Sequence, residues 1–236
     1  MDIALFMDFE LNNPLTYLSK FKKLIKDEGW VLDLFWASDY TKKKRPSVDE
    51  KILKANFLII RKPLTFLSSA NIRSKLQEII RKKKKNLLIM YTFTEFESLG
   101  VLNQFLEPFK IQLSELQIID NTTNQNDTRT VVFHKKNKCF NHKFLFNGVQ
   151  KVIIPHPHHM YLAKPAEILI RGNPSSEIKD SIYMDTSKLK GSDLIVGAYH
   201  ESNGKILVLD STLFLDQYFD YNKKFIRNVF HYLAEK

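Results

Sequence analysis

Short apolar runs alternate with amphipathic helical segments in the N-terminal half of the chain, and this order constrains the fold more than any other feature. Four runs have the length and composition of buried strands: residues 2–7, 30–36, 57–60 and 86–91. Before the last of them, apolar residues recur at helical spacing: Ile72, Leu76, Ile79 and Ile80. Parallel strands joined by helices form right-handed crossovers and are covered on both faces. We therefore predict an α/β fold, with a Rossmann-like or flavodoxin-like, mostly parallel sheet and helices on both faces.

The C-terminal half has a different texture. The apolar runs after Ile111 are shorter and are separated by polar turns: residues 116–120, 130–134, 151–155 and 167–171. Residues 194–200 and 205–210 flank a short segment ending in Gly204, which predicts a hairpin. No internal repeat and no linker rich in Pro, Gly and Ser divides the chain. We predict extra β-strands in this half and a single domain over residues 1–236.

The composition is typical of a globular protein of the cytoplasm. Of 236 residues, 44% are hydrophobic and 26% are charged. The only cysteine, Cys139, excludes an internal disulfide and fits a reducing compartment. The N-terminus has no basic, apolar leader, and no apolar run is long enough to cross a bilayer. We expect a cytoplasmic protein without a membrane span.

The net charge of +10 raises the question of a nucleic-acid partner. Two basic runs, residues 42–45 and 81–85, carry much of the local charge, but no nucleic-acid-binding motif accompanies either of them. The first lies in a predicted loop, and the second ends a predicted helix, where cations suit the helix dipole. We expect both runs to be solvated, and we expect no specific binding of nucleic acid.

Candidate nucleophiles lack the surroundings that catalysis needs. Class I glutamine amidotransferases place a nucleophilic Cys on a sharp turn after a central strand, whereas the matching strand end here carries Tyr91 and Thr92. Cys139 lies in a polar segment with no helix behind it to lower its pKa. Asp210 and Ser211 lack the flanking glycines of a nucleophile elbow, so we expect them to cap the turn that follows their strand. We predict no catalytic residue and no enzyme activity.

The stretch PHPHH, residues 155–159, holds three of the seven histidines. In an extended chain His156 and His158 share a face, and a third metal ligand is available from His159, His142 or His200. Two prolines interrupt the segment, however, and no carboxylate accompanies it. We expect a surface turn, no bound metal and no cofactor.

The stretch from residue 204 to residue 233 carries a recognisable pattern. Its matching positions are Gly204, Lys205, Ser211, Phe214, Asp216, Gln217, Tyr218, Asn222, Tyr232 and Leu233. Residues 140–149 and 152–173 extend the pattern through His142, Lys143, Asn147, Gly148, Val149, Pro155, Leu162, Lys164, Pro165, Ala166 and Leu169. The chain thereby resembles the amidotransferase-like domain of gliding-motility and ABC-transport accessory proteins and of an intraflagellar transport (IFT-B) subunit. The resemblance implies a late strand and a C-terminal helix here, with the helix following Asn222 and with Asp216, Gln217 and Tyr218 on the connection.

The missing nucleophile and the resemblance together favour a non-catalytic domain that binds or scaffolds other proteins. Two alternatives remain: a domain that binds a small molecule or a glycan in the crevice at the carboxyl ends of the strands, and a hydrolase with an unrecognised acid–base pair. The residues that we expect to contact a ligand or partner are Asp8, Glu10, Tyr91, Thr92, His156, Asp210, Ser211, Asp216 and Tyr218.

Overall fold

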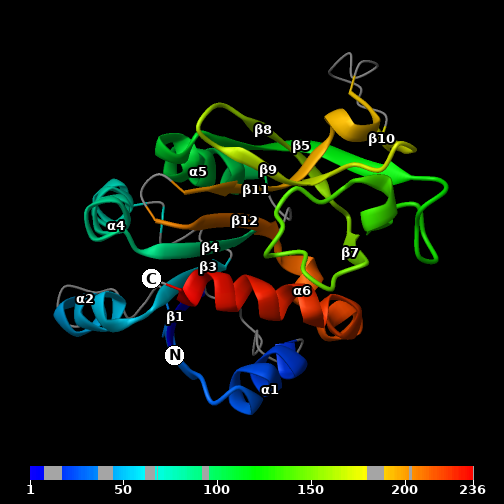
Figure 1. Cartoon of the computed structure of the whole chain (residues 1–236). Helices are drawn as coiled ribbons and strands as arrows, with labels where there is room; N and C mark the ends of the chain where they lie inside the picture. The colour runs from blue at the N-terminus through cyan, green and yellow to red at the C-terminus, as the bar shows by residue number, and fades with distance from the viewer. Residues whose placement is uncertain are drawn as a thin grey trace.

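A seven-stranded sheet forms the centre of the computed structural model, with the strand order β2-β1-β3-β4-β12-β11-β9 (Figure 1). The structure describes residues 1–7, 18–36, 45–61, 67, 69–91, 96–179, 189–201 and 204–235. The parallel strands are β1 (Asp2–Met7), β2 (Val31–Trp36), β3 (Phe57–Arg61), β4 (Asn86–Tyr91) and β12 (Ile206–Asp210). The strands β11 (Ile195–His200) and β9 (Glu167–Arg171) continue the sheet, and β11 pairs antiparallel with both β12 and β9. The predicted, mostly parallel sheet and the predicted hairpin are confirmed.

Helices cover both faces of this sheet, as predicted. One face packs against α1 (Ser19–Asp27) and α6 (Asp216–Ala234), and α6 crosses in front of the sheet in Figure 1. The other face packs against α2 (Arg45–Lys54), α4 (Ala70–Lys83) and α5 (Phe96–Leu106). In β3, Phe57 and Ile59 belong to the first core, whereas Leu58 and Ile60 belong to the second. Both faces of the strand are therefore buried, which explains its continuous apolar sequence.

The C-terminal half adds the extra strands that its short apolar runs predict. The strands β10 (Ser176–Ile178), β5 (Ile111–Asp120) and β8 (His158–Leu162) form an antiparallel sheet. The strands β6 (Thr130–His134) and β7 (Lys151–Pro155) form a separate antiparallel pair. The short 3-10 helix η3 (Glu107–Phe109) follows α5, and the 3-10 helix η6 (Ser211–Phe214) follows β12.

Two buried asparagines fix α6 to the C-terminal strands. The amide of Asn222 bonds to both the N–H and the carbonyl of Ile153 in β7, at 2.9 and 2.8 Å. The amide of Asn228 donates to the carbonyls of Leu145 and Asn147. The helix begins at Asp216, six residues before Asn222, so the prediction of an irregular connection there is wrong. Burial of Phe219 extends the apolar face of the helix, and the carboxylate of Asp216 suits a helix N-terminus.

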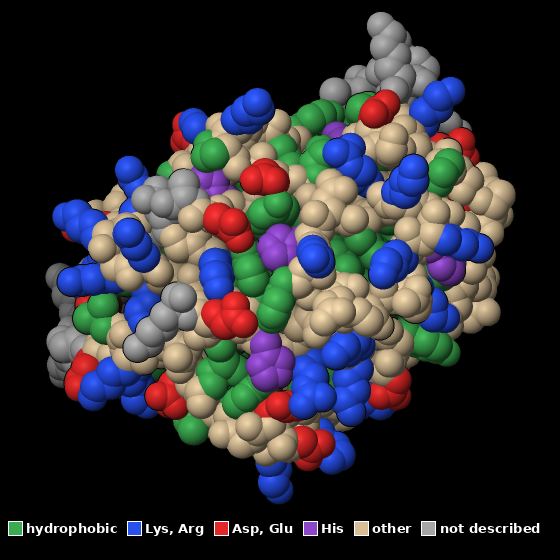
Figure 2. All heavy atoms as spheres, in the orientation of Figure 1, with side chains coloured by type: hydrophobic (Ala, Val, Ile, Leu, Met, Phe, Trp, Pro, Cys, Tyr) green, Lys and Arg blue, Asp and Glu red, His purple; other side chains and the backbone are tan. Residues whose placement is uncertain are grey.

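The described residues of the two basic runs lie near opposite ends of the parallel strands. Arg45 begins α2, whereas residues 81–83 end α4, and both helices run antiparallel to the parallel strands that they connect. An ion pair between Lys75 and Asp49 holds these helices side by side. Figure 2 shows lysine and arginine side chains spread over the visible face rather than gathered in one groove. Residues 42–44 lie outside the described part of the chain.

No helix among the described residues is long and apolar enough to cross a membrane.

Candidate functional site

The carboxyl ends of β4 and β12 bring two of the predicted site residues together. Tyr91 and Asp210 are register partners on these neighbouring strands. Both side chains are buried, at 2% and 1% exposed, and Ser211 is buried directly after them. Asp8, Glu10 and Thr92, which we expect at the same edge, lie outside the described residues. The described part of this edge is therefore a closed cluster.

Asp210 caps the turn that follows its strand, as expected. Its Oδ1 accepts a hydrogen bond from the Thr212 N–H at 2.9 Å and lies 2.7 Å from the Thr212 hydroxyl. That hydroxyl also lies 3.0 Å from the carbonyl oxygen of Pro155. The hydrogen bonds from Thr212 favour the ionised carboxylate of Asp210, whereas burial disfavours it. Burial outweighs these bonds and raises the pKa of Asp210 to about 7.

Tyr91 adds a second proton-bearing group rather than a nucleophile. Burial and the neighbouring charge of Asp210 raise the pKa of Tyr91 well above its ordinary value. The phenol therefore keeps its proton at neutral pH. A phenol that keeps its proton is a weak nucleophile at neutral pH.

Cys139 is buried, although its neighbours in the sequence are mostly polar. Its Sγ lies 3.2 Å from the side-chain oxygen of Asn173, and the residue is fully shielded from solvent. Burial raises the pKa of the Cys139 thiol to about 11. The thiolate needed for nucleophilic chemistry is therefore scarce at neutral pH.

The three histidine side chains of residues 155–159 lie in different environments. His156 is exposed, adopts a positive φ of 50°, and places its Nδ1 2.9 Å from Nε2 of Gln117. His158 and His159 are buried in β8, and burial lowers the pKa of each to about 4. His159 Nδ1 accepts a hydrogen bond from the Ile195 N–H at 3.1 Å. Within the described ranges no three His, Cys, Asp or Glu side chains are grouped to hold a metal.

Asp216 holds two helices together. Its carboxylate accepts hydrogen bonds from the backbone N–H groups of Ser19 and Lys20, at 3.0 and 2.8 Å, and so caps the start of α1. Burial opposes its ionisation, but these hydrogen bonds prevail and lower the pKa of Asp216. Tyr218 lies in the first turn of α6 and is partly exposed. Asp216 and Tyr218 are both predicted contact residues, and Asp216 is the one whose side chain caps α1.

A buried carboxylate that sequence reasoning missed organises the far end of β5. Asp120 accepts hydrogen bonds from the N–H groups of Thr122 and Thr123 and from the hydroxyl of Ser176, all between 2.8 and 2.9 Å. The amide of Asn173 adds a fourth donor at 3.2 Å. These bonds outweigh burial and hold the pKa of Asp120 well below its usual range. The signal for it was an Asp at a strand end before Asn-Thr-Thr, a pattern typical of side-chain-capped turns.

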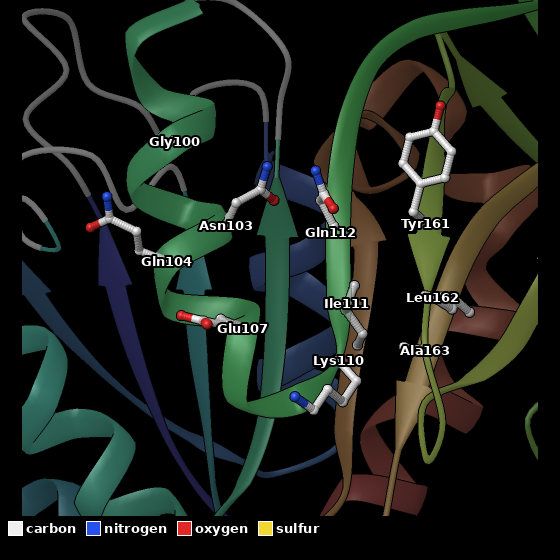
Figure 3. A pocket seen from close by; sticks show the side chains of 10 residues that line it. All are labelled: Gly100, Asn103, Gln104, Glu107, Lys110, Ile111, Gln112, Tyr161, Leu162 and Ala163. Carbon is white, nitrogen blue, oxygen red and sulfur yellow. The ribbon is translucent and has the colours of Figure 1, made fainter.

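The surface carries clefts away from the strand ends. One cleft, of about 430 Å³, lies between α5–η3 and the strands β5 and β8 (Figure 3). Asn103, on its helical wall, bonds to both backbone groups of Leu113 in β5, at 3.0 and 2.8 Å. Gly100 lies on the same wall, and a side chain there would meet open space. The cleft is therefore preformed by the packing of α5 on β5.

Comparison with known proteins relates the chain to others through its fold. No family model and no curated protein sequence matches it. Its structure is similar to that of the mmIFT52 N-terminal domain, with a TM-score of 0.74 and 15% identity, over 99% of this chain and 98% of that one. It also matches the glutaminase domain of the Trypanosoma brucei CTPS with bound acivicin, with a TM-score of 0.48 and 10% identity, over 99% of this chain and 93% of that one. The first similarity confirms the fold that the sequence resemblance implied.

Proposed function

We propose that this chain is a non-catalytic, amidotransferase-like domain that binds other proteins, that it forms one domain over residues 1–236, and that it works in the cytoplasm. The observation that carries the proposal is the chemistry at the ends of β4 and β12. Tyr91 and Asp210 are buried side by side, and burial raises the pKa of both. Amidotransfer needs an exposed thiolate at such a position, whereas the cysteine of this chain is buried elsewhere as a thiol.

The fold supports the same proposal. The chain and the mmIFT52 N-terminal domain match over nearly their whole lengths, and the resemblance to an intraflagellar transport subunit implies protein partners. Several positions that carry this resemblance have internal structural roles in this chain. Asn222 joins α6 to β7, Asn147 accepts from Asn228, and Asp216 caps α1. A shared fold maintained by such contacts does not require shared catalysis.

Two measurements test the proposal. Ammonia release from glutamine should not exceed that of a buffer blank, and the rate should be the same for the Cys139→Ser protein. Glutamine hydrolysis that disappears in Thr92→Ala or Asp210→Asn would overturn the proposal. Cross-linking in the native host, followed by mass spectrometry, should join exposed lysines of this chain to the same partner proteins in independent preparations. Cross-links within the chain alone would count against a scaffold.

A further inference from the structure

Among the residues that the structure describes, the outer edge of β9 is only partly paired. This strand ends the seven-stranded sheet, next to β11. Residues 139–141 lie along its second half: the Arg171 N–H donates to the Cys139 carbonyl at 2.8 Å, and the Asn141 N–H donates to the Leu169 carbonyl at 3.2 Å. Residues 143–148 then form turns. This edge of β9 therefore pairs with an extended, antiparallel segment of the chain, residues 139–141. The pairing ends at the hydrogen bond between Asn141 and Leu169.

A cleft begins where this pairing stops. It has a volume of about 470 Å³ and is bounded by Asn141 on one side, by Glu167 and Ile168 of β9, and by Leu162 at the end of β8 with Ala163 after it. An unpaired strand edge beside an open cleft is the arrangement to which an added strand binds, because its main chain extends the sheet while its side chains enter the cleft.

This cleft continues in both directions along the surface. Leu162 and Ala163 also line the cleft beside α5 that Figure 3 shows. Asn141 and Tyr199 also line a third cleft, of about 590 Å³, which extends to the exposed ring of Phe144. We call these three connected clefts the β9 groove. Its length suits an extended polymer better than a compact ligand.

The charges along the β9 groove select the occupant. Four cations line it: Lys110, Lys143, Lys164 and Arg171. Its two carboxylates are those of Glu107 and Glu167, and the second accepts a hydrogen bond from the Tyr199 hydroxyl at 2.6 Å. Isoleucine and leucine side chains supply apolar surface between the charges. A segment that alternates acidic and apolar side chains complements both features.

We propose that the β9 groove binds an extended, acidic segment of a partner protein, which adds an antiparallel strand beyond Asn141 at the edge of β9. This proposal rests on the protein-binding function proposed above and names the surface and the kind of partner. Nucleic acid would satisfy the cations but offers no row of amide groups for the strand edge.

The test begins with a random peptide library displayed on phage and selected on the folded protein. Enriched peptides should be acidic, and their synthetic forms should bind in a fluorescence anisotropy titration. The double variant Lys110→Glu/Lys164→Glu should bind them about tenfold more weakly, because both side chains are exposed and line the groove. The matched control is Arg81→Glu/Lys83→Glu, which makes the same change of charge on exposed residues of α4. The control should bind within about twofold of the wild type.

A second arm tests strand addition itself. Alternate residues of a strand point their N–H groups to the same side, so N-methylation in one alternating frame should abolish binding while the other frame should be tolerated. Equal effects of the two frames, equal losses in the two charge variants, or no enriched peptide would overturn the proposal. So would tighter binding of single-stranded DNA that Lys110→Glu/Lys164→Glu weakens.

The outcomes separate this proposal from the proposed function. Host cross-links to partner proteins that map to another face would leave the protein-binding function intact and overturn the β9 groove. Glutamine hydrolysis would overturn the non-catalytic function without changing the peptide result.

Discussion

Truncation of Phe230 should strongly destabilise the protein. The side chain is fully buried. Its ring centroid lies 5.6 Å from those of Phe21 and Trp30 and 5.4 Å from that of Phe57. These rings belong to α1, to the residue before β2, and to β3. One side chain therefore joins the helical layer to the central sheet.

The size of the effect follows from the cavity. Phe→Ala in a core costs about 3–5 kcal/mol, and the cost is higher where the surroundings cannot collapse. Here the surrounding groups belong to separate helices and strands that are held by their own contacts, so we expect the upper part of that range. For a domain of this size, about 2–4 °C of melting temperature corresponds to each kcal/mol. The melting temperature of Phe230→Ala should therefore fall by about 8–20 °C.

Urea unfolding followed by far-UV circular dichroism measures the effect without relying on Trp30, whose fluorescence the change would alter. Tyr221→Ala is the matched control, because it truncates an aromatic side chain of the same helix that is 47% exposed. Phe230→Leu, which keeps most of the volume, should recover much of the loss. If Phe230→Ala unfolds at the same urea concentration as Tyr221→Ala, the structural account of this helix is refuted.

Three further predictions concern Asp210, Asp120 and Cys139. The pKa of Asp210 is about 7 in the folded protein against 3.8 as its ordinary value, so its contribution to stability is complete below about pH 4 and is lost as the pH rises through 7. Asp210→Asn should lose less stability than the wild type between about pH 4 and pH 7 in urea unfolding, and identical profiles would contradict the raised pKa. Asp120 has a lowered pKa, so its stabilisation is present above its ordinary pKa and is lost as the pH falls through the lowered value. Asp120→Asn should cost about 2–3 kcal/mol near neutral pH, whereas the partly exposed Asp127→Asn should cost clearly less, and equal costs would argue against the buried network. Cys139 should react with a disulfide reagent only after unfolding in guanidinium, because it is shielded and its pKa is about 11; rapid reaction of the native protein would place it at the surface.

The amino-acid sequence by itself determined the architecture of the central sheet. Strands buried on both faces must be apolar at successive positions, so 57–60 and 86–91 reveal both their conformation and their burial. The hairpin that ends in β12 also follows from local residues, because a glycine with a φ of 104° permits the turn before Lys205. The cap formed by Asp210 belongs to the same class, since its partner Thr212 is two residues away.

Only the tertiary structure decided the chemistry of the candidate sites. The raised pKa of Asp210 depends on its complete burial beside Tyr91, and the depressed pKa of Asp120 depends in part on the hydroxyl of Ser176, 56 residues away. Cys139 has mostly polar neighbours in the sequence, but in the folded chain it is buried against Gly172 and Asn173. Of the neighbouring histidines His156 and His158, only His156 is exposed. The open part of the β9 edge likewise depends on where residues 139–141 stop beside Leu169. Periodicity and capping act over a few residues and are visible in the sequence, whereas burial, pKa and sheet edges are set by segments that only the folded chain brings together.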